Sequence, residues 1–126
     1  MYYAGQGLNQ DYFKAFEWYQ KAAEQDEALA QYRLGNMYYD GQGVKQDYFK
    51  AVEWWQKAAD QGYASAQFNL GFMYYNGHGV RQNYTKAKEY FGLACDNKKQ
   101  KGCDMYKELN QLLKILSLLV HNYVQH

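Results

Sequence analysis

Three segments of the sequence combine a Gly-x-Gly pair with neighbouring tyrosines, and glycine pairs of this kind can hold a phosphate. They read MYYAGQGL at 1–8, MYYDGQGV at 37–44 and MYYNGHGV at 73–80. A phosphate-binding glycine loop follows a β-strand and opens a helix, so that its backbone N–H groups point at the anion. Here the glycines follow a helical pattern, and no Lys-Ser or Lys-Thr comes after them. We therefore predict that Gly41 and Gly43 are hinges between two helices.

Side chains that could act as nucleophiles or metal ligands are scattered along the chain. His78, His121 and His126 have no cysteine or carboxylate near them at the spacing of metal ligands. Neither Ser65 nor Ser117 begins a Ser-x-x-Lys motif, which would place a base beside a serine nucleophile. The sequence therefore predicts no catalytic residue, no metal site and no cofactor, and it favours a protein that is not an enzyme.

Two cysteines, Cys95 and Cys103, are the other residues that could do chemistry. A disulfide, a pair of buried free thiols and a zinc site are the three alternatives. Zinc would need two further ligands, and none is nearby in the sequence. An isolated cysteine is commonly a small buried apolar residue, so free thiols compete directly with a disulfide.

The elements that must position these residues are repeated along the chain. Residues 1–36 and 37–72 are identical at 24 of 36 positions without a gap, and residues 73–95 continue the same register. From Cys95 onward the match fades, and Lys107 stands where the preceding unit has Gly71. Repeated units share a continuous core that one unit could not bury alone. We therefore predict a single domain over 1–126, with units at 1–36, 37–72 and 73–110.

Each unit is expected to contain two helices, which we call helix A and helix B. Apolar residues recur at helical spacing over 63–75 for helix A and over 47–59 for helix B. Asp47 stands where an N-cap oxygen would accept a hydrogen bond from the first turn of helix B. The DQG segment at 60–62 turns the chain into the next helix A. The fold class predicted is therefore all-α.

Composition narrows the classes of partner. The net charge is +1, with 14 Lys and Arg against 13 Asp and Glu, so the surface offers no strong field to nucleic acid or to an anionic membrane. The longest apolar run, ILSLLV at 115–120, is far shorter than the ~20 residues of a membrane span. No charged segment followed by an apolar one opens the chain, so no signal peptide is expected.

The segment ASAQFNLGFMYYNGHGVRQNYTKAKEYFGLA at 64–94 resembles the Sel-1-like repeat, a relative of the tetratricopeptide repeat. The resemblance covers residues 1–110, and the 36-residue period separates it from the 34-residue tetratricopeptide form. It implies an α-solenoid, in which antiparallel helix pairs form a right-handed superhelix. It also implies an adaptor that binds a protein or peptide, often in bacterial envelopes or secreted to host cells.

Positions that are the same in every unit are expected to be architectural, and those that differ on helix A are the candidates for partner binding. Gly35 and Gly71 are predicted to allow close helix approach, as are the alanines of helix B. In this family helix A lines the concave surface, so a mixed stripe with one exposed aromatic, Phe72, favours a peptide or loop partner; a merely solvated face is the alternative. The predicted partner-binding residues are Arg33, Asn36, Asp40, Asn69, Phe72 and Asn76. The aromatic residues Tyr38, Tyr74, Trp18 and Trp54 are expected on buried stripes.

The segment ACDNKKQKGC at 94–103 matches the spacing of the cysteine-rich secreted bacterial members of this family. The match implies a disulfide between Cys95 and Cys103, and two replacements within one unit favour it further. A disulfide indicates an oxidising compartment, so we expect a periplasmic or secreted protein, with the cytoplasm as the alternative. Two other functions follow from relatives: weak β-lactamase or penicillin-binding activity, and a toxin-neutralising envelope module.

Both ends of the array are expected to differ from its middle. The first helix B lacks a complete helix A before it, so its apolar face predicts self-association through an open N-terminal end; that face comprises Tyr12, Ala15, Trp18, Tyr19 and Ala22. At the other end a capping helix is predicted at about 102–122, and its apolar face is expected to close the superhelix or to form a dimer contact. That face comprises Tyr106, Leu109, Leu112, Leu113 and Leu116.

Overall fold

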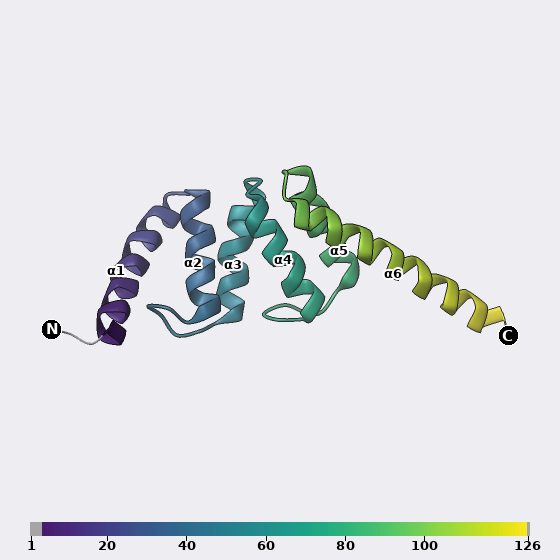
Figure 1. Ribbon diagram of the computed structural model, residues 1–126, viewed down its shortest axis with the longest axis horizontal. Coiled ribbons are helices and arrows are strands. Elements are labelled where there is room, and N and C mark those ends of the chain that lie inside the picture. Colours follow the sequence, from purple (N-terminus) through teal and green to yellow (C-terminus); the bar gives the residue numbers. More distant parts are fainter. Residues whose placement is uncertain (1–3, 126) are drawn as a thin grey trace.

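The computed structural model describes residues 4–125, with side chains described from Asp11 onward, and contains six helices within that range. They are α1 (Ala4–Glu24), α2 (Ala28–Asp40), α3 (Tyr48–Asp60), α4 (Ala64–Asn76), α5 (Tyr84–Asp96) and α6 (Gln100–Gln125). Figure 1 shows α1 to α5 side by side in one elongated row, with α6 leading away from its far end. No strand occurs among residues 4–125. The predicted all-α solenoid is confirmed, with α2 and α4 as helix A and α3 and α5 as helix B.

The helices begin and end where the residue types predict. The Asp47 carboxylate accepts a hydrogen bond of 3.1 Å from the backbone N–H of Lys50, which confirms the predicted N-cap of α3. Gly41 ends α2 in the left-handed conformation at φ 71°, which costs glycine little because it has no Cβ. Gly43 also has positive φ, and a Cβ there would collide with the backbone carbonyl of Tyr12. Both are hinges, as predicted.

The first unit departs from the repeat, because α1 runs without a break through Gly5 and Gly7. The equivalent hinge glycines, Gly43 and Gly79, lie against backbone carbonyls of the preceding helix B, at Tyr12 and Tyr48. No helix B precedes Gly7 in the described residues, so the contact that holds the hinge is missing and the helix continues. The expected end of a first helix A, at residues 1–3, lies outside the described residues.

Close contact between helix A and helix B forms the core. The Trp55 side chain of α3 lies on Gly35 of α2, and Trp55 Nε1 donates a hydrogen bond of 3.1 Å to the Tyr32 carbonyl oxygen. The Phe91 ring of α5 lies on Gly71 of α4 in the same way. The helix-B alanines of these units are fully buried, namely Ala51, Ala58, Ala87 and Ala94. The burial predicted for these alanines is therefore confirmed in the second and third units, whereas Ala15 and Ala22 of the first unit are half-buried.

Trp18 was expected on a buried stripe, and that prediction is wrong. Tyr38 is buried, and Tyr74 and Trp54 are half-buried, whereas the Trp18 side chain is 74% exposed. Trp18 belongs to α1, and no described helix precedes α1 to cover that side of it. The predicted self-association through this end stays a prediction.

Two buried glutamines join consecutive units, a device that the sequence analysis did not predict. Gln31 Nε2 donates a hydrogen bond of 3.2 Å to the Ala23 carbonyl oxygen at the end of α1, and Gln67 Nε2 donates one of 3.1 Å to the Ala59 carbonyl oxygen at the end of α3. Each amide oxygen in turn accepts from the residue after the next helix B: Gln31 from Gln61, and Gln67 from Asn97. Every polar atom of these buried side chains is thereby satisfied.

The C-terminal helix is longer than expected, and only its first half caps the array. Leu109 is 2% exposed and Asn110 Oδ1 accepts a hydrogen bond of 2.9 Å from Lys88 Nζ. Leu112 and Leu116, expected to close the superhelix, are 36% and 40% exposed. The reason is length: α5 has 13 residues and α6 has 26, so α5 covers only the first turns of α6.

The glycine contacts generate a stability prediction. Gly35→Ala should lower the free energy of unfolding by about 1–3 kcal/mol, because the added Cβ would overlap the Trp55 indole in a packed core. Gly92→Ala is the matched control on α5. Its Cβ would lie 3.1 Å from the side chain of Tyr106, which is partly exposed and free to turn. That control should gain up to about 1 kcal/mol from helix propensity. Chemical denaturation measures both, and equal midpoints would contradict the prediction.

Candidate functional site

A groove about 340 Å³ in volume lies between the two complete A helices, and we call it the central groove. Helix α2 supplies Asn36, Tyr39 and Asp40, and α4 supplies Asn69, Phe72, Met73 and Asn76. Trp55 reaches it from α3, and His78 reaches it from the loop after α4. The groove is therefore a product of the repeat, because equivalent residues of successive A helices form its two walls.

Stacked aromatic rings support this groove from one end. The Tyr39 and Tyr48 rings stack with centroids 5.0 Å apart, and the His78 imidazole stacks on Tyr48 at 5.1 Å. Tyr39 also packs against Trp55 at 5.6 Å. Each of these rings therefore packs against at least one neighbouring ring at this end of the groove.

Two further hollows extend the central groove in both directions. One lies between α1 and α2, is about 320 Å³ in volume, and shares Asn36 and Asp40 with the central groove. The other lies between α4 and α6, is about 400 Å³ in volume, and shares Phe72. The shared residues join the three hollows into one surface from α1 to α6, which we call the A-face. Its outer parts are lined by Tyr12, Ala15, Tyr19, Arg33, Met37 and Gln42 on one side and by Phe68, Lys101, Asp104 and Met105 on the other.

All six residues predicted to bind a partner lie on the A-face. Five of them line the central groove, and Arg33 lines the hollow beside α1. Their side chains are accessible: Arg33, Asp40 and Asn76 are exposed, and Asn36 and Asn69 are half-buried. The structure thus brings the six into one surface, and their role in binding stays a prediction.

Phe72 was expected to be the exposed aromatic residue of this stripe. In the structure its ring is half-buried. It meets the Phe68 ring edge-on at 5.0 Å and the Phe91 ring edge-on at 5.2 Å. Phe91 is the residue that packs on Gly71, so the core fixes the orientation of Phe72. What remains exposed is one part of a fixed ring, which lines two hollows at once.

The sequence analysis missed the groove residues that are shared with the core. Trp55, Tyr39 and Met73 were assigned to packing or not singled out, yet their side chains also line the central groove. His78 was considered only as a possible metal ligand, although it stands where the preceding unit has Gln42 in the hinge loop. The change from Gln42 to His78 was the signal in the sequence that could have revealed this residue, because an imidazole ring at this position can stack on Tyr48.

Groups that could support catalysis do not gather in the described residues. Lys99 Nζ lies 3.5 Å from Ser65 Oγ, at the limit of a hydrogen bond, and this pair lines none of the three hollows. Burial raises the pKa of the Tyr90 hydroxyl, which donates a hydrogen bond of 2.8 Å to Gln56 Oε1; such a phenol stays neutral near pH 7. No cluster of three potential metal ligands occurs in the described part of the chain. None of the helices described there is long and apolar enough to cross a membrane.

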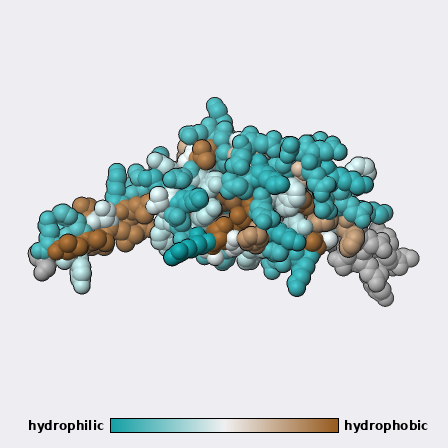
Figure 2. Space-filling model, turned by 180° about the vertical axis from the view of Figure 1, so that it is seen from behind, coloured by the Kyte–Doolittle hydropathy of each residue, from teal (hydrophilic) through white to brown (hydrophobic). Residues whose placement is uncertain are grey.

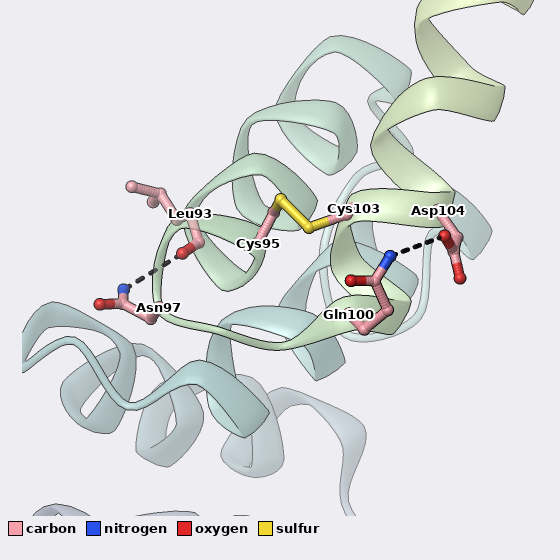
Figure 3. Close-up of a disulfide and its surroundings, with 6 residues drawn as sticks. All are labelled: Leu93, Cys95, Asn97, Gln100, Cys103 and Asp104. Atoms are coloured by element: carbon pink, nitrogen blue, oxygen red, sulfur yellow. Dashed lines mark hydrogen bonds between the residues drawn. A yellow bond between two sulfur atoms is a disulfide. The ribbon is translucent and has the colours of Figure 1, made fainter.

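A disulfide joins Cys95 at the end of α5 to Cys103 in the first turn of α6, with Cα atoms 4.6 Å apart (Figure 3). The two cysteines occupy the positions of Ala59 and Gln67 in the preceding unit. The covalent bond therefore stands where that unit has the buried hydrogen bond from a glutamine to an alanine carbonyl oxygen. The turn between the cysteines is held by Asn97 Nδ2, which donates a bond of 3.1 Å to the Leu93 carbonyl oxygen.

Comparison with known proteins agrees with this architecture. The model of the Sel1 repeat family matches residues 1–27, 28–63 and 64–99. A Sel1 repeat protein from Oxalobacter formigenes is 36% identical over 71% of this chain and 37% of its own, with a TM-score of 0.70. A protective antigen of uropathogenic Escherichia coli strains that displays an SLR fold is 37% identical over 90% of this chain and 26% of its own, with a TM-score of 0.77. Cysteine-rich protein B of Helicobacter pylori is 30% identical over 71% of this chain and 68% of its own, with a TM-score of 0.69.

The chain belongs to the Sel1 repeat family. The Sel1 repeat is generally a scaffold for protein–protein interaction, and the three similar proteins are bacterial. The chain spans about a third and about a quarter of the lengths of the first two of these proteins. No curated protein sequence matches the chain significantly.

The disulfide should contribute about 2–3 kcal/mol to the free energy of unfolding, because a cross-link over a short loop restricts the unfolded chain. Denaturation with and without reductant measures this, and Cys95→Ala/Cys103→Ala should lose the same amount and become insensitive to reductant. Cys95→Ala/Cys103→Gln restores the residues of the preceding unit and should regain about 1 kcal/mol through the glutamine hydrogen bond. Two free thiols in the unfolded, unreduced protein would contradict the bridge.

Proposed function

We propose that the protein is an adaptor that binds an extended peptide segment or a loop of a partner protein along the A-face. The observation that carries the proposal is the continuity of this surface: three hollows from α1 to α6 share residues, and every predicted partner-binding residue lines them. The scaffold role that is general for the Sel1 repeat supports it.

The polar groups of the A-face suit the backbone of an extended peptide. Asn36, Asn69 and Asn76 each carry an amide with two N–H donors and one acceptor oxygen. An extended segment presents unpaired N–H and C=O groups along its length, and amide side chains can pair with both kinds. Among the described residues that line the central groove, Asp40 is the only carboxylate, and neither Lys nor Arg is present. The groove therefore imposes no strong charge requirement on a ligand.

Phe72 is the anchor that we propose for an apolar side chain of the partner. Its ring is fixed by Phe68 and Phe91 and borders the apolar hollow that contains Met105. A rigid aromatic loses little conformational entropy when it is buried, and such residues dominate binding energy at interfaces. If the A-face only contacted solvent, there would be no need for the Phe72 ring to be held between Phe68 and Phe91.

We also propose a periplasmic or secreted location, with the cytoplasm as the alternative. The Cys95–Cys103 disulfide supports it, since disulfides persist in oxidising compartments. The similarity to a cysteine-rich protein of Helicobacter pylori supports it as well.

Two other functions were considered for the chain. A toxin-neutralising module would be a narrower form of the proposed adaptor role. β-Lactam chemistry through a serine nucleophile would have to use Ser65 or Ser117, and neither lines the A-face, so the geometry does not favour it.

A peptide selected from an unbiased displayed library on the immobilised protein provides the test ligand. Phe72→Ala and Asn36→Ala/Asn69→Ala should each weaken its binding about tenfold or more, as expected for the centre of an interface. Phe13→Ala is the matched control, because this side chain is 62% exposed on α1 and lines none of the hollows. Isothermal calorimetry measures the dissociation constants, and thermal melts confirm that the variants are folded.

Competition among several independently selected peptides completes this experiment. Peptides that bind the A-face should exclude one another. Full affinity in the Phe72 and Asn36/Asn69 variants, with loss in the Phe13 control, would place the binding surface elsewhere and overturn the proposal.

A further inference from the structure

The second half of α6 leaves the body of the protein and carries a band of exposed apolar side chains. Beyond Asn110 no residue of this helix is buried. Figure 2 shows the band in brown along the projecting end of the helix, on the face turned to the viewer. The exposed apolar residues are Leu112, Ile115, Leu116, Leu118, Leu119, Val120, Tyr123 and Val124. Their exposure reaches 85% at Tyr123, which makes this an apolar surface without a partner in the described chain.

The band has the spacing of a helix–helix contact. Leu112, Leu116, Leu119 and Tyr123 follow Leu109 at alternating intervals of three and four residues, the pattern of a and d positions in paired helices. Leu109 is buried against α5 in the core, so the same stripe is continuous with an interface that already exists. The opposite side of the helix carries Lys114, Ser117 and His121. The segment is therefore amphipathic, with a wide apolar face.

We propose that this segment, which we call the α6 stripe (Leu112, Leu116, Leu119 and Tyr123), forms an antiparallel contact with the same segment of a second copy of the chain. The stripe is self-complementary under a two-fold axis. When the midpoint between Ser117 and Leu118 is shared, Leu112 faces Tyr123 of the second copy and Leu116 faces Leu119. A symmetric dimer needs this property, because the same patch must fit itself.

The position of the helix on the body favours the antiparallel arrangement. Helix α6 joins the row of α1 to α5 through its first half and projects with its second half (Figure 1). Antiparallel pairing of the projecting halves places the two bodies at opposite ends of the contact. Parallel pairing would bring both bodies to the same end, where they would compete for space.

The available area and charge suit a dimer better than a membrane surface. Fully burying one side chain of this size removes roughly 60–120 Å² of apolar surface from water. The six exposed apolar residues other than Leu118 and Val124, which lie away from the stripe, then supply on the order of 500 Å² per copy, near the roughly 600 Å² per copy at which specific interfaces begin. Helices that bind membrane surfaces are rich in Lys and Arg on the polar face. Residues 112–125 contain one Lys and no Arg.

Sedimentation velocity of the whole chain tests the contact from about 1 to about 300 µM, a range that includes the micromolar affinity expected of a small interface. The wild type should shift from monomer to dimer. Leu116→Glu/Leu119→Glu should raise the dissociation constant at least about tenfold, because each charge would be buried against apolar side chains. Ser117→Glu/His121→Glu adds the same charge to the side of the helix opposite the stripe and should dimerise as the wild type does. Circular dichroism should show equal helix content in all three.

A charge-swap experiment tests the direction of pairing. Leu112→Glu alone should weaken the dimer, and Leu112→Glu/Tyr123→Lys should restore it, because the two changed residues face each other only in the antiparallel register. No recovery in this double variant would overturn the antiparallel contact.

The same measurements distinguish the proposed dimer from other partners that could cover the α6 stripe. A wild type that stays monomeric over the whole range would overturn the proposal, and so would a dimer that persists in Leu116→Glu/Leu119→Glu. A dimer that is lost only in Trp18→Glu would place the contact at α1 instead. Monomeric protein that co-sediments with vesicles of phosphatidylcholine and phosphatidylglycerol would assign the stripe to a membrane surface and also overturn the dimer.

Discussion

The contact of a helix-B ring with a helix-A glycine sets the geometry on which the rest of the structure depends. Trp55 lies on Gly35 and Phe91 lies on Gly71, so each helix pair is closer than a side chain at the glycine position would allow. Because the pairs are close and alike, successive A helices stand at a regular spacing with one face outward. The grooves of the A-face are the spaces between them, and Trp55 itself forms part of one wall.

A second constraint holds one unit to the next. Gln31 and Gln67 each bond the end of the preceding helix B and receive a bond from the residue that follows the next helix B. Glutamine can do both because its amide is donor and acceptor. At the third junction Cys95 and Cys103 replace the alanine and the glutamine with a covalent bond. No helix B follows this junction in the described residues, and a cross-link there supplies stability that packing supplies in the other two.

We expect partner binding at positions where the residue type differs between the repeat units. Phe72 has no aromatic counterpart, since Asn36 occupies its position in the preceding unit, and it marks the transition from a polar groove to an apolar hollow. Lys107 stands at the position of Gly71, so the contact of a ring with a glycine that Phe91 makes on α4 has no counterpart on α6. Within the described residues, no side chain beyond Asn110 on α6 is buried.

The repeat, the helix pairs, the hinges and the N-cap Asp47 were all predictable from the sequence, because each depends on local residue types or on comparison between units. The stripe Arg33, Asn36, Asp40, Asn69, Phe72 and Asn76 was predictable as a set, since helical periodicity places these residues on one side. Only the tertiary structure decided which of them shape a groove: Phe72 is half-buried because Phe68 and Phe91 reach it. Likewise, Trp18 and Leu116 have the periodicity of buried residues and are exposed because none of the described helices lies opposite them. Periodicity defines an apolar face, but burial needs a neighbour, and the neighbour is fixed by the three-dimensional packing.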